Sequence, residues 1–121
     1  MKIKQYICLL LITLPLIVFA DNETNKNEIK KKCQYPDQPI IPNALSITEE
    51  ELITTQQKVK TFIKEGEQYL KCIAKVEKSW GDDVTFEQKQ SVALIHNKVV
   101  ENMEAVADLF NSALRVYKGN K

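Results

Sequence analysis

Two cysteines, Cys33 and Cys72, set the strongest constraint on how this chain can fold. Cys33 opens a proline-rich run that ends at Pro42, and Cys72 lies deep in a stretch with the periodicity of an amphipathic helix. A bond between the two sulfurs requires their Cα atoms to come within about 7 Å of each other. The proline-rich run would then be laid back along the helix and held against it.

The spacing of the cysteines is consistent with that arrangement. The predicted helix start, Thr48, is about 36 Å from Cys72 along a helix at 1.5 Å per residue. Residues 34–47 cover that distance at about 2.6 Å each, which is below the 3.1 Å of polyproline II. Prolines bias the backbone toward extended geometry, so we expect a nearly extended arm antiparallel to the helix.

Two helices are predicted, over about residues 48–79 and 86–118. Thr48 and Thr85 each precede, by three positions, a Glu or Gln that completes a capping box. Gly81 can supply the left-handed residue after the first helix, and the short turn favours an antiparallel pair. We therefore predict an all-α fold, an antiparallel two-helix hairpin whose extended N-terminal arm is tied to the first helix by the disulfide.

The first twenty residues have the pattern of a secretory signal peptide. A basic start precedes an almost wholly apolar run over residues 6–19, and Val18 and Ala20 are the small residues that a signal peptidase requires. An uncleaved membrane anchor is the alternative, but the run is shorter than the roughly 20 residues of a bilayer span. We expect residues 1–20 to be cleaved, which leaves no stable membrane span.

Removing this segment also removes Cys8 and leaves Cys33 and Cys72 as a pair. An even number of cysteines in an exported chain is typical of a disulfide, because compartments outside the cytoplasm are oxidising. A metal held by two thiolates is the alternative, but it needs further ligands and His96 is the only histidine. We expect a disulfide, no cofactor, and a periplasmic or secreted location.

Composition bears on two further points. The chain has 17 basic and 16 acidic residues, which gives no basic surface of the kind that nucleic-acid binding needs, so we expect no nucleic-acid partner. Residues 21–32 contain one large apolar side chain, Ile29. Such a segment buries too little surface to offset the entropy of ordering, and we expect a disordered leader there.

A bare two-helix hairpin of this length is marginally stable. The proline-rich arm can cover one of its grooves. Self-association into a four-helix bundle is the other way to bury the remaining apolar surface. Both alternatives stay open, and the second predicts a homodimer.

Candidate chemical groups are few. His96 lies beside the apolar stripe of the second helix. The sequence pattern places no further residue beside it that would complete a catalytic or metal site. Asp82 and Asp83 lack the further oxygen ligands of a calcium loop. The sequence shows no nucleophile–base arrangement and no carboxylate pair, so we predict no catalytic residues, no metal ligands and no enzyme activity.

Trp80 is the most distinctive single side chain, because a large aromatic residue at the tip of a hairpin is hard to cover. Phe86 follows in the turn, and Tyr117 occupies a related heptad position of the second helix. Two interpretations stay open: packing at the end of the helices, and an exposed interaction patch centred on Trp80.

Four motifs follow one another: Cys33-x-Tyr-Pro-x-x-Pro-x-Ile-Pro42, Thr48-Glu-Glu-Glu51, Gln57-x-Val59-Lys-x-Phe62 and Glu67-x-Tyr-Leu-x-Cys72. This order resembles a group of small, exported, uncharacterised proteobacterial proteins with a Cys/Pro-rich arm before a helix that carries Tyr-Leu-x-Cys. The resemblance covers about forty residues, implies an exported, periplasmic helical protein, and implies no activity.

The sequence therefore indicates a structural or protein-interaction role in the cell envelope, with an unidentified protein partner. The alternative is a ligand- or metal-binding module formed between the helices of a dimer. Inward-facing polar residues would distinguish the second class, and the two apolar stripes contain few of them.

Overall fold

The computed structural model describes residues 21–121, with side chains from residue 26 onward. Over this range the protein is all-helical and has no strand, in agreement with the predicted class. The elements in chain order are α1 (Asp21–Lys32), α2 (Glu49–Ser79), the 3-10 helix η1 (Gly81–Asp83) and α3 (Phe86–Gly119). The expected signal peptide, residues 1–20, lies outside the described residues.

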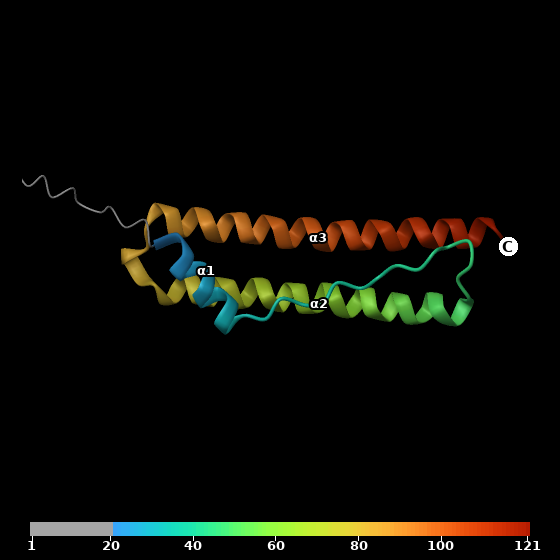
Figure 1. The fold of residues 1–121 in the computed structure, drawn as a ribbon, viewed down its shortest axis with the longest axis horizontal. Helices are drawn as coiled ribbons and strands as arrows, with labels where there is room; N and C mark the ends of the chain where they lie inside the picture. Colours follow the sequence, from blue (N-terminus) through green and yellow to red (C-terminus); the bar gives the residue numbers. More distant parts are fainter. Residues whose placement is uncertain (1–20) are drawn as a thin grey trace, which may run out of the picture.

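The helices are arranged along one long axis (Figure 1). α2 and α3 lie side by side over their length, and α1 lies against both of them near the end where η1 joins them. Residues 33–48 connect α1 to α2 with only a turn at residues 44–46. This connection runs from the α1 end of the molecule to its opposite end before α2 begins (Figure 1).

Both long helices begin at the predicted threonines. The Thr48 hydroxyl accepts the Glu51 N–H at 3.2 Å, and the Glu51 carboxylate accepts the Thr48 N–H at 2.8 Å. Thr85 and Gln88 form the same reciprocal pair, at 3.1 and 2.8 Å. These bonds satisfy backbone donors that a helix start leaves unpaired, and they confirm both capping boxes.

The end of α2 also follows its local chemistry. Gly81 has a φ of 68°, a conformation that costs glycine little because it has no Cβ. The chain turns there into η1, and Thr85 then starts α3. The predicted left-handed glycine after the first long helix is therefore confirmed.

The core consists of two clusters at opposite ends of the long helices. The first lies at the end away from η1, and its buried members are Ile47, Leu52, Val59, Phe62, Val106 and Phe110. The second lies nearer η1, and its buried members are Ile29, Cys33, Ile73, Val76 and Val92. Residues 33–48 supply one member to each cluster, so this connection contributes to both halves of the core.

The prediction of a disordered leader at residues 21–32 is wrong, because these residues form α1. Ile29 is 2% exposed in the second core cluster, and the Glu28 carboxylate accepts the Trp80 indole N–H at 3.0 Å. α1 ends directly before Cys33, which the disulfide holds in place. Ordering a segment that is already fixed at one end loses less chain entropy, so one buried apolar side chain can suffice.

Gly66 is buried on the seam between α2 and α3. A Cβ atom at this position would lie 2.8 Å from Met103 Sδ. The sequence left open a close approach of another backbone or a simple tolerance of glycine. The structure shows a third situation, in which a side chain of α3 occupies the space that glycine leaves.

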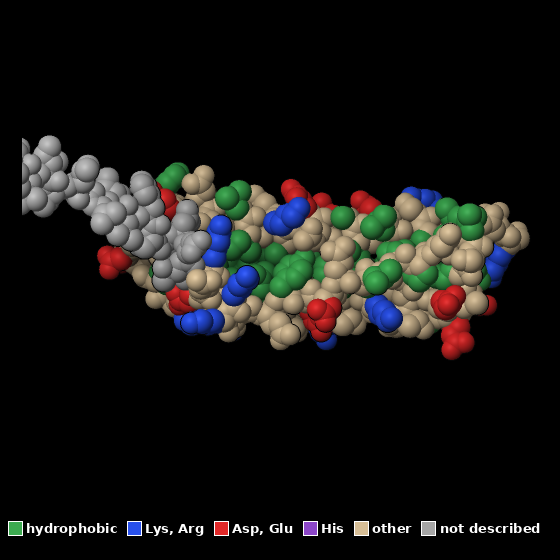
Figure 2. Space-filling view, in the orientation of Figure 1, with side chains coloured by type: hydrophobic (Ala, Val, Ile, Leu, Met, Phe, Trp, Pro, Cys, Tyr) green, Lys and Arg blue, Asp and Glu red, His purple; other side chains and the backbone are tan. Residues whose placement is uncertain are grey.

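The surface distributes charge around this core. Figure 2 shows hydrophobic side chains along the middle of one face, with basic and acidic side chains of mixed sign along its edges. No helix among residues 21–121 is long and apolar enough to cross a membrane.

Candidate functional site

The predicted cysteine pair forms a disulfide. Cys33 and Cys72 are joined with their Cα atoms 5.7 Å apart, which links the residue that follows α1 to the last third of α2. Cys72 Sγ also lies 3.4 Å from the Lys32 carbonyl oxygen; we regard this as a contact, because a disulfide sulfur carries no hydrogen to donate. Two bonded sulfurs are not thiolates, so this pair does not provide the metal ligands of the alternative.

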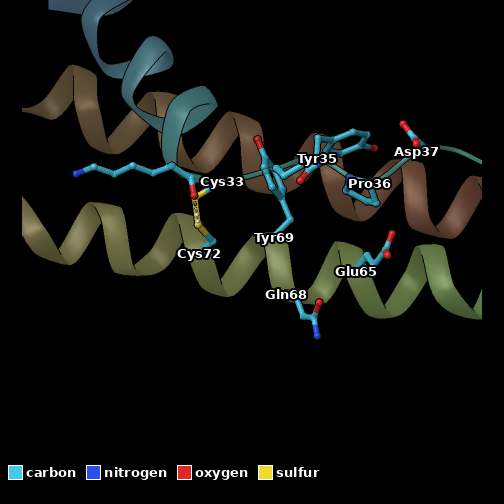
Figure 3. Close-up of a pocket in the computed structure, with 10 residues that line it drawn as sticks. Cys33, Tyr35, Pro36, Asp37, Glu65, Gln68, Tyr69 and Cys72 are labelled. Atoms are coloured by element: carbon cyan, nitrogen blue, oxygen red, sulfur yellow. Dashed lines mark hydrogen bonds between the residues drawn. A yellow bond between two sulfur atoms is a disulfide. The ribbon is translucent and has the colours of Figure 1, made fainter.

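A pocket of about 370 Å³ opens beside the disulfide. One wall comes from the chain that follows α1, and the opposite wall comes from α2 (Figure 3). The lining residues are Lys32, Cys33, Gln34, Tyr35, Pro36, Asp37, Glu65, Gln68, Tyr69 and Cys72. Of the labelled side chains, Tyr69 extends from α2 toward Tyr35, whereas Gln68 points away from the opposite wall (Figure 3).

Tyr35 is held by contacts from two helices. Its ring meets the Tyr69 ring edge-on, with centroids 5.3 Å apart, and meets the Phe62 ring in the same way at 6.4 Å. Its hydroxyl accepts a hydrogen bond from Asn102 Nδ2 of α3 at 2.9 Å. Edge-to-face pairs and a hydrogen bond at the ring's far end define the position of this side chain, so the aromatic side of the pocket is preorganised.

Tyr69 is the half-buried aromatic residue of α2 in the pocket. Burial raises the pKa of its hydroxyl, and the neighbouring Tyr35 raises it further. The phenol therefore stays protonated at neutral pH and can donate a hydrogen bond. Within residues 26–121 the Tyr69 hydroxyl has no hydrogen-bond partner.

Two carboxylates complete the pocket. Asp37 lies on the wall that follows α1, and Glu65 lies on α2 (Figure 3). In the described part of the chain neither forms an ion pair. The basic lining residue, Lys32, has its ammonium group 2.7 Å from the Glu28 carboxylate. Lys32 is therefore ion-paired within α1 and not with Asp37 or Glu65.

A second hollow of about 410 Å³ adjoins the first. Its lining residues are Asp37, Gln38, Pro39, Thr54, Gln57, Lys58, Thr61, Phe62 and Glu65. Asp37 and Glu65 line both spaces. The two spaces are therefore neighbouring parts of one groove between the proline-rich chain and α2, which we call the arm groove.

Trp80, the candidate interaction residue of the sequence analysis, makes its contacts within the chain. It is half-buried against the second core cluster and donates its indole N–H to Glu28. Hydrogen bonds from Lys32 and Trp80 lower the pKa of the Glu28 carboxyl. Phe86, six residues further along the chain, is 75% exposed, whereas Tyr117 packs against the first core cluster. Trp80, Phe86 and Tyr117 therefore form no common patch.

The remaining candidate groups lie apart from the pocket. His96 is exposed on α3, and Asp82 and Asp83 are exposed in η1. Among the residues with described positions, no group of three or more His, Cys, Asp or Glu side chains could hold a metal ion.

Sequence reasoning missed the arm groove, although it singled out most of the segments that form it. Tyr35 and Tyr69 both belong to the motifs that carried the resemblance to exported proteobacterial proteins. The lining acids, Asp37 and Glu65, belong to no motif that would have marked them in the sequence.

No protein-family model, curated protein or solved structure matches the chain, and the resemblance stays a prediction.

Proposed function

We propose that this is an exported helical protein with a structural or protein-interaction role in the cell envelope, and that the arm groove is its recognition surface. The signal-peptide pattern of residues 1–20 and the Cys33–Cys72 disulfide support a periplasmic or secreted location, because disulfides persist in oxidising compartments. The proposed activity is binding, and it includes no catalytic step.

The proposal includes a specific architecture. α2 and α3 act as an antiparallel hairpin, and residues 33–47 act as an arm held in one groove of that hairpin. The Tyr35 contacts to Phe62 and Asn102 support this arrangement, as does the burial of Ile47 with residues of both long helices. The disulfide joins the start of the arm to α2, so the groove wall cannot move away while the bond is intact.

The observation that carries the proposal is the arm groove itself. It combines a rigid aromatic wall at Tyr35 and Tyr69 with polar groups that have no partner among residues 26–121, namely Asp37, Glu65 and the Tyr69 hydroxyl. Polar groups that no other part of the chain satisfies are available to a partner. Trp80 lacks this property, because its only polar hydrogen is already donated.

The occupant that we assign to the arm groove is a segment of another envelope protein. Site-specific photo-crosslinking in the producing cell tests this. A photoreactive phenylalanine analogue at Gln57 or Thr61, which line the groove, should give one and the same adduct. The matched control carries the analogue at Glu104, an exposed position of α3 outside the lining of both pockets, and should not give it.

The disulfide supplies a second control. Replacing Cys33 and Cys72 with serine releases the arm and should abolish the groove-specific adduct. Equal adducts from Glu104 and from the groove positions would contradict the proposal, and so would the absence of any adduct from both groove positions. An adduct that survives the double serine replacement would show that the pinned arm is not part of the surface.

Homodimerisation stays a prediction, as does a ligand- or metal-binding module formed in such a dimer. Sedimentation equilibrium at tens of micromolar protein checks the first directly. A monomer at that concentration would contradict both, because the second depends on the first.

A further inference from the structure

We propose that α1 is a lid over a second binding site. The lid opens as a unit about Cys33 while α2, α3 and the arm stay folded, and opening uncovers an apolar site for a helix of another protein. This inference goes beyond the arm groove, because it concerns the end of the molecule where α1 lies against both long helices (Figure 1).

Few contacts hold α1 closed. Of its described side chains, residues 26–32, only Ile29 is buried, at 2% exposure, and the Glu28 carboxylate accepts the Trp80 indole N–H at 3.0 Å. α2 and α3, by contrast, bury seven and six residues. A helix of 12 residues is marginal on its own in water. Elements with few buried apolar contacts open at a much smaller free energy than the whole fold, so α1 can open by itself.

The disulfide places the hinge at the end of α1. Cys33 follows α1 directly, is 5% exposed and is bonded to Cys72. Beyond Cys33, the arm is held by the ring contacts of Tyr35 and by the burial of Ile47. Opening of α1 leaves all of these contacts intact, and the moving part therefore ends at Lys32.

The surface under α1 is apolar and has one polar donor. Buried side chains of both long helices form the second core cluster with Ile29, and Trp80 packs against that cluster and donates its indole N–H to Glu28. The cluster members from the long helices are Ile73, Val76 and Val92.

α1 itself shows which chemistry this surface accepts. The pair that docks is a carboxylate directly before a branched aliphatic side chain, Glu28-Ile29, presented on a helix. A partner helix with the same pair and further apolar residues would bury more apolar surface than one isoleucine does, in the manner of an amphipathic helix in a groove. α1 is then an internal competitor that keeps the site covered until such a helix arrives.

Hydrogen exchange of the oxidised protein, followed by nuclear magnetic resonance in water and in low urea, tests the lid. The backbone amides of residues 29–33 should exchange about a hundredfold faster than those of Ile73 and Val76. Their rates should change little with urea, because local opening exposes little surface. Equal rates and equal urea dependence for all these amides would overturn the proposal, since α1 would then open only when the whole fold does.

Two alanine variants separate docking from helix propensity, which alanine raises in both. Ile29→Ala removes the buried contact and should raise exchange of the α1 amides about tenfold or more. The matched control, Lys31→Ala, changes an exposed position of α1 and should not raise it. Equal effects of the two variants would overturn the proposal. Loss of protection at Ile73 and Val76 in Ile29→Ala would also overturn it, because α1 would then be an integral part of the core.

Fluorescence anisotropy with a labelled peptide tests the occupant. The probe is a synthetic helix that carries Glu-Ile pairs one heptad apart, and its control peptide has Gln-Ser in place of each pair. The probe should bind Ile29→Ala about tenfold more tightly than the wild type, because a closed lid reduces the apparent affinity by the fraction of open molecules. The control peptide should bind neither protein. Equal affinities of the probe for the two proteins, or no binding to either, would overturn the assignment.

Discussion

Replacing both Cys33 and Cys72 with serine tests what the disulfide contributes to the fold. The two residues are separated by 39 positions. A closed loop of that length restricts the unfolded chain by an entropy worth about 4 kcal/mol at 25 °C. A small domain has a total free energy of unfolding of about 5–15 kcal/mol, so the loss would be a large fraction of the stability.

The measurement is urea unfolding followed by far-ultraviolet circular dichroism. For a domain of this size the free energy falls by about 1–3 kcal/mol per molar urea, so the midpoint should fall by about 1 to 4 M. The samples are the oxidised protein, the same protein with reductant, and the double serine variant. Cys8→Ser in all samples removes the third cysteine, which lies in the predicted signal peptide.

The two ways of removing the bond should agree. Reduction and double serine replacement should lower the midpoint equally, and reductant should not change the serine variant. A loss below about 1 kcal/mol would refute the reasoning, because the bond would then not restrict the unfolded chain as calculated. The contacts of Tyr35 and Ile47 would in that case hold the arm without it.

Three further predictions concern single side chains. Hydrogen bonds lower the pKa of the Glu28 carboxyl, so its contribution is present above the ordinary pKa of 4.5 and is lost as the pH falls through the lower folded-state value. Fluorescence of Trp80, the only tryptophan, should therefore change in the wild type as the pH falls below the ordinary carboxyl pKa of 4.5, and not in Glu28→Gln. Burial raises the pKa of Tyr69, so stability should fall as the pH rises from the ordinary pKa of 10.0 toward the higher folded-state value; Tyr69→Phe should lose less stability over that range in urea unfolding. Gly66→Ala should stabilise α2 by up to about 1 kcal/mol in a Met103→Ala background, because alanine has the higher helix propensity. The gain should be smaller in the wild type, where the new Cβ would lie 2.8 Å from Met103 Sδ. A double-mutant cycle in urea unfolding that shows equal effects in both backgrounds would contradict this.

The starts of the two long helices were predictable because their causes are local. Thr48 with Glu51, and Thr85 with Gln88, are only three residues apart, and each pair forms its bonds as soon as the first turn is helical. Gly81 likewise acts through its own φ. The disulfide was predictable for a different reason: once Cys8 is set aside, only one pairing of the remaining cysteines exists.

α1 was not predictable from its composition. Its polar sequence has the character of a disordered segment, and the contacts that order it come from residues far along the chain. The indole N–H of Trp80 reaches Glu28 across 52 positions, and Ile29 is buried beside Val76 and Val92. The same contacts show Trp80 packed against the second core cluster, which is one of the two interpretations that the sequence left open.

The sequence by itself determined the two long helices, their N-terminal caps and the identity of the cysteine pair, because periodicity and capping act over a few residues and the cysteines left one choice. Only the tertiary structure decided what lies beside that pair. Asp37 and Glu65 are distant in sequence, and they line one pocket because the chain that follows Cys33 lies along α2. Such a site depends on how two segments are placed relative to each other, and that placement comes from the packing of Tyr35 and Ile47 and from the disulfide.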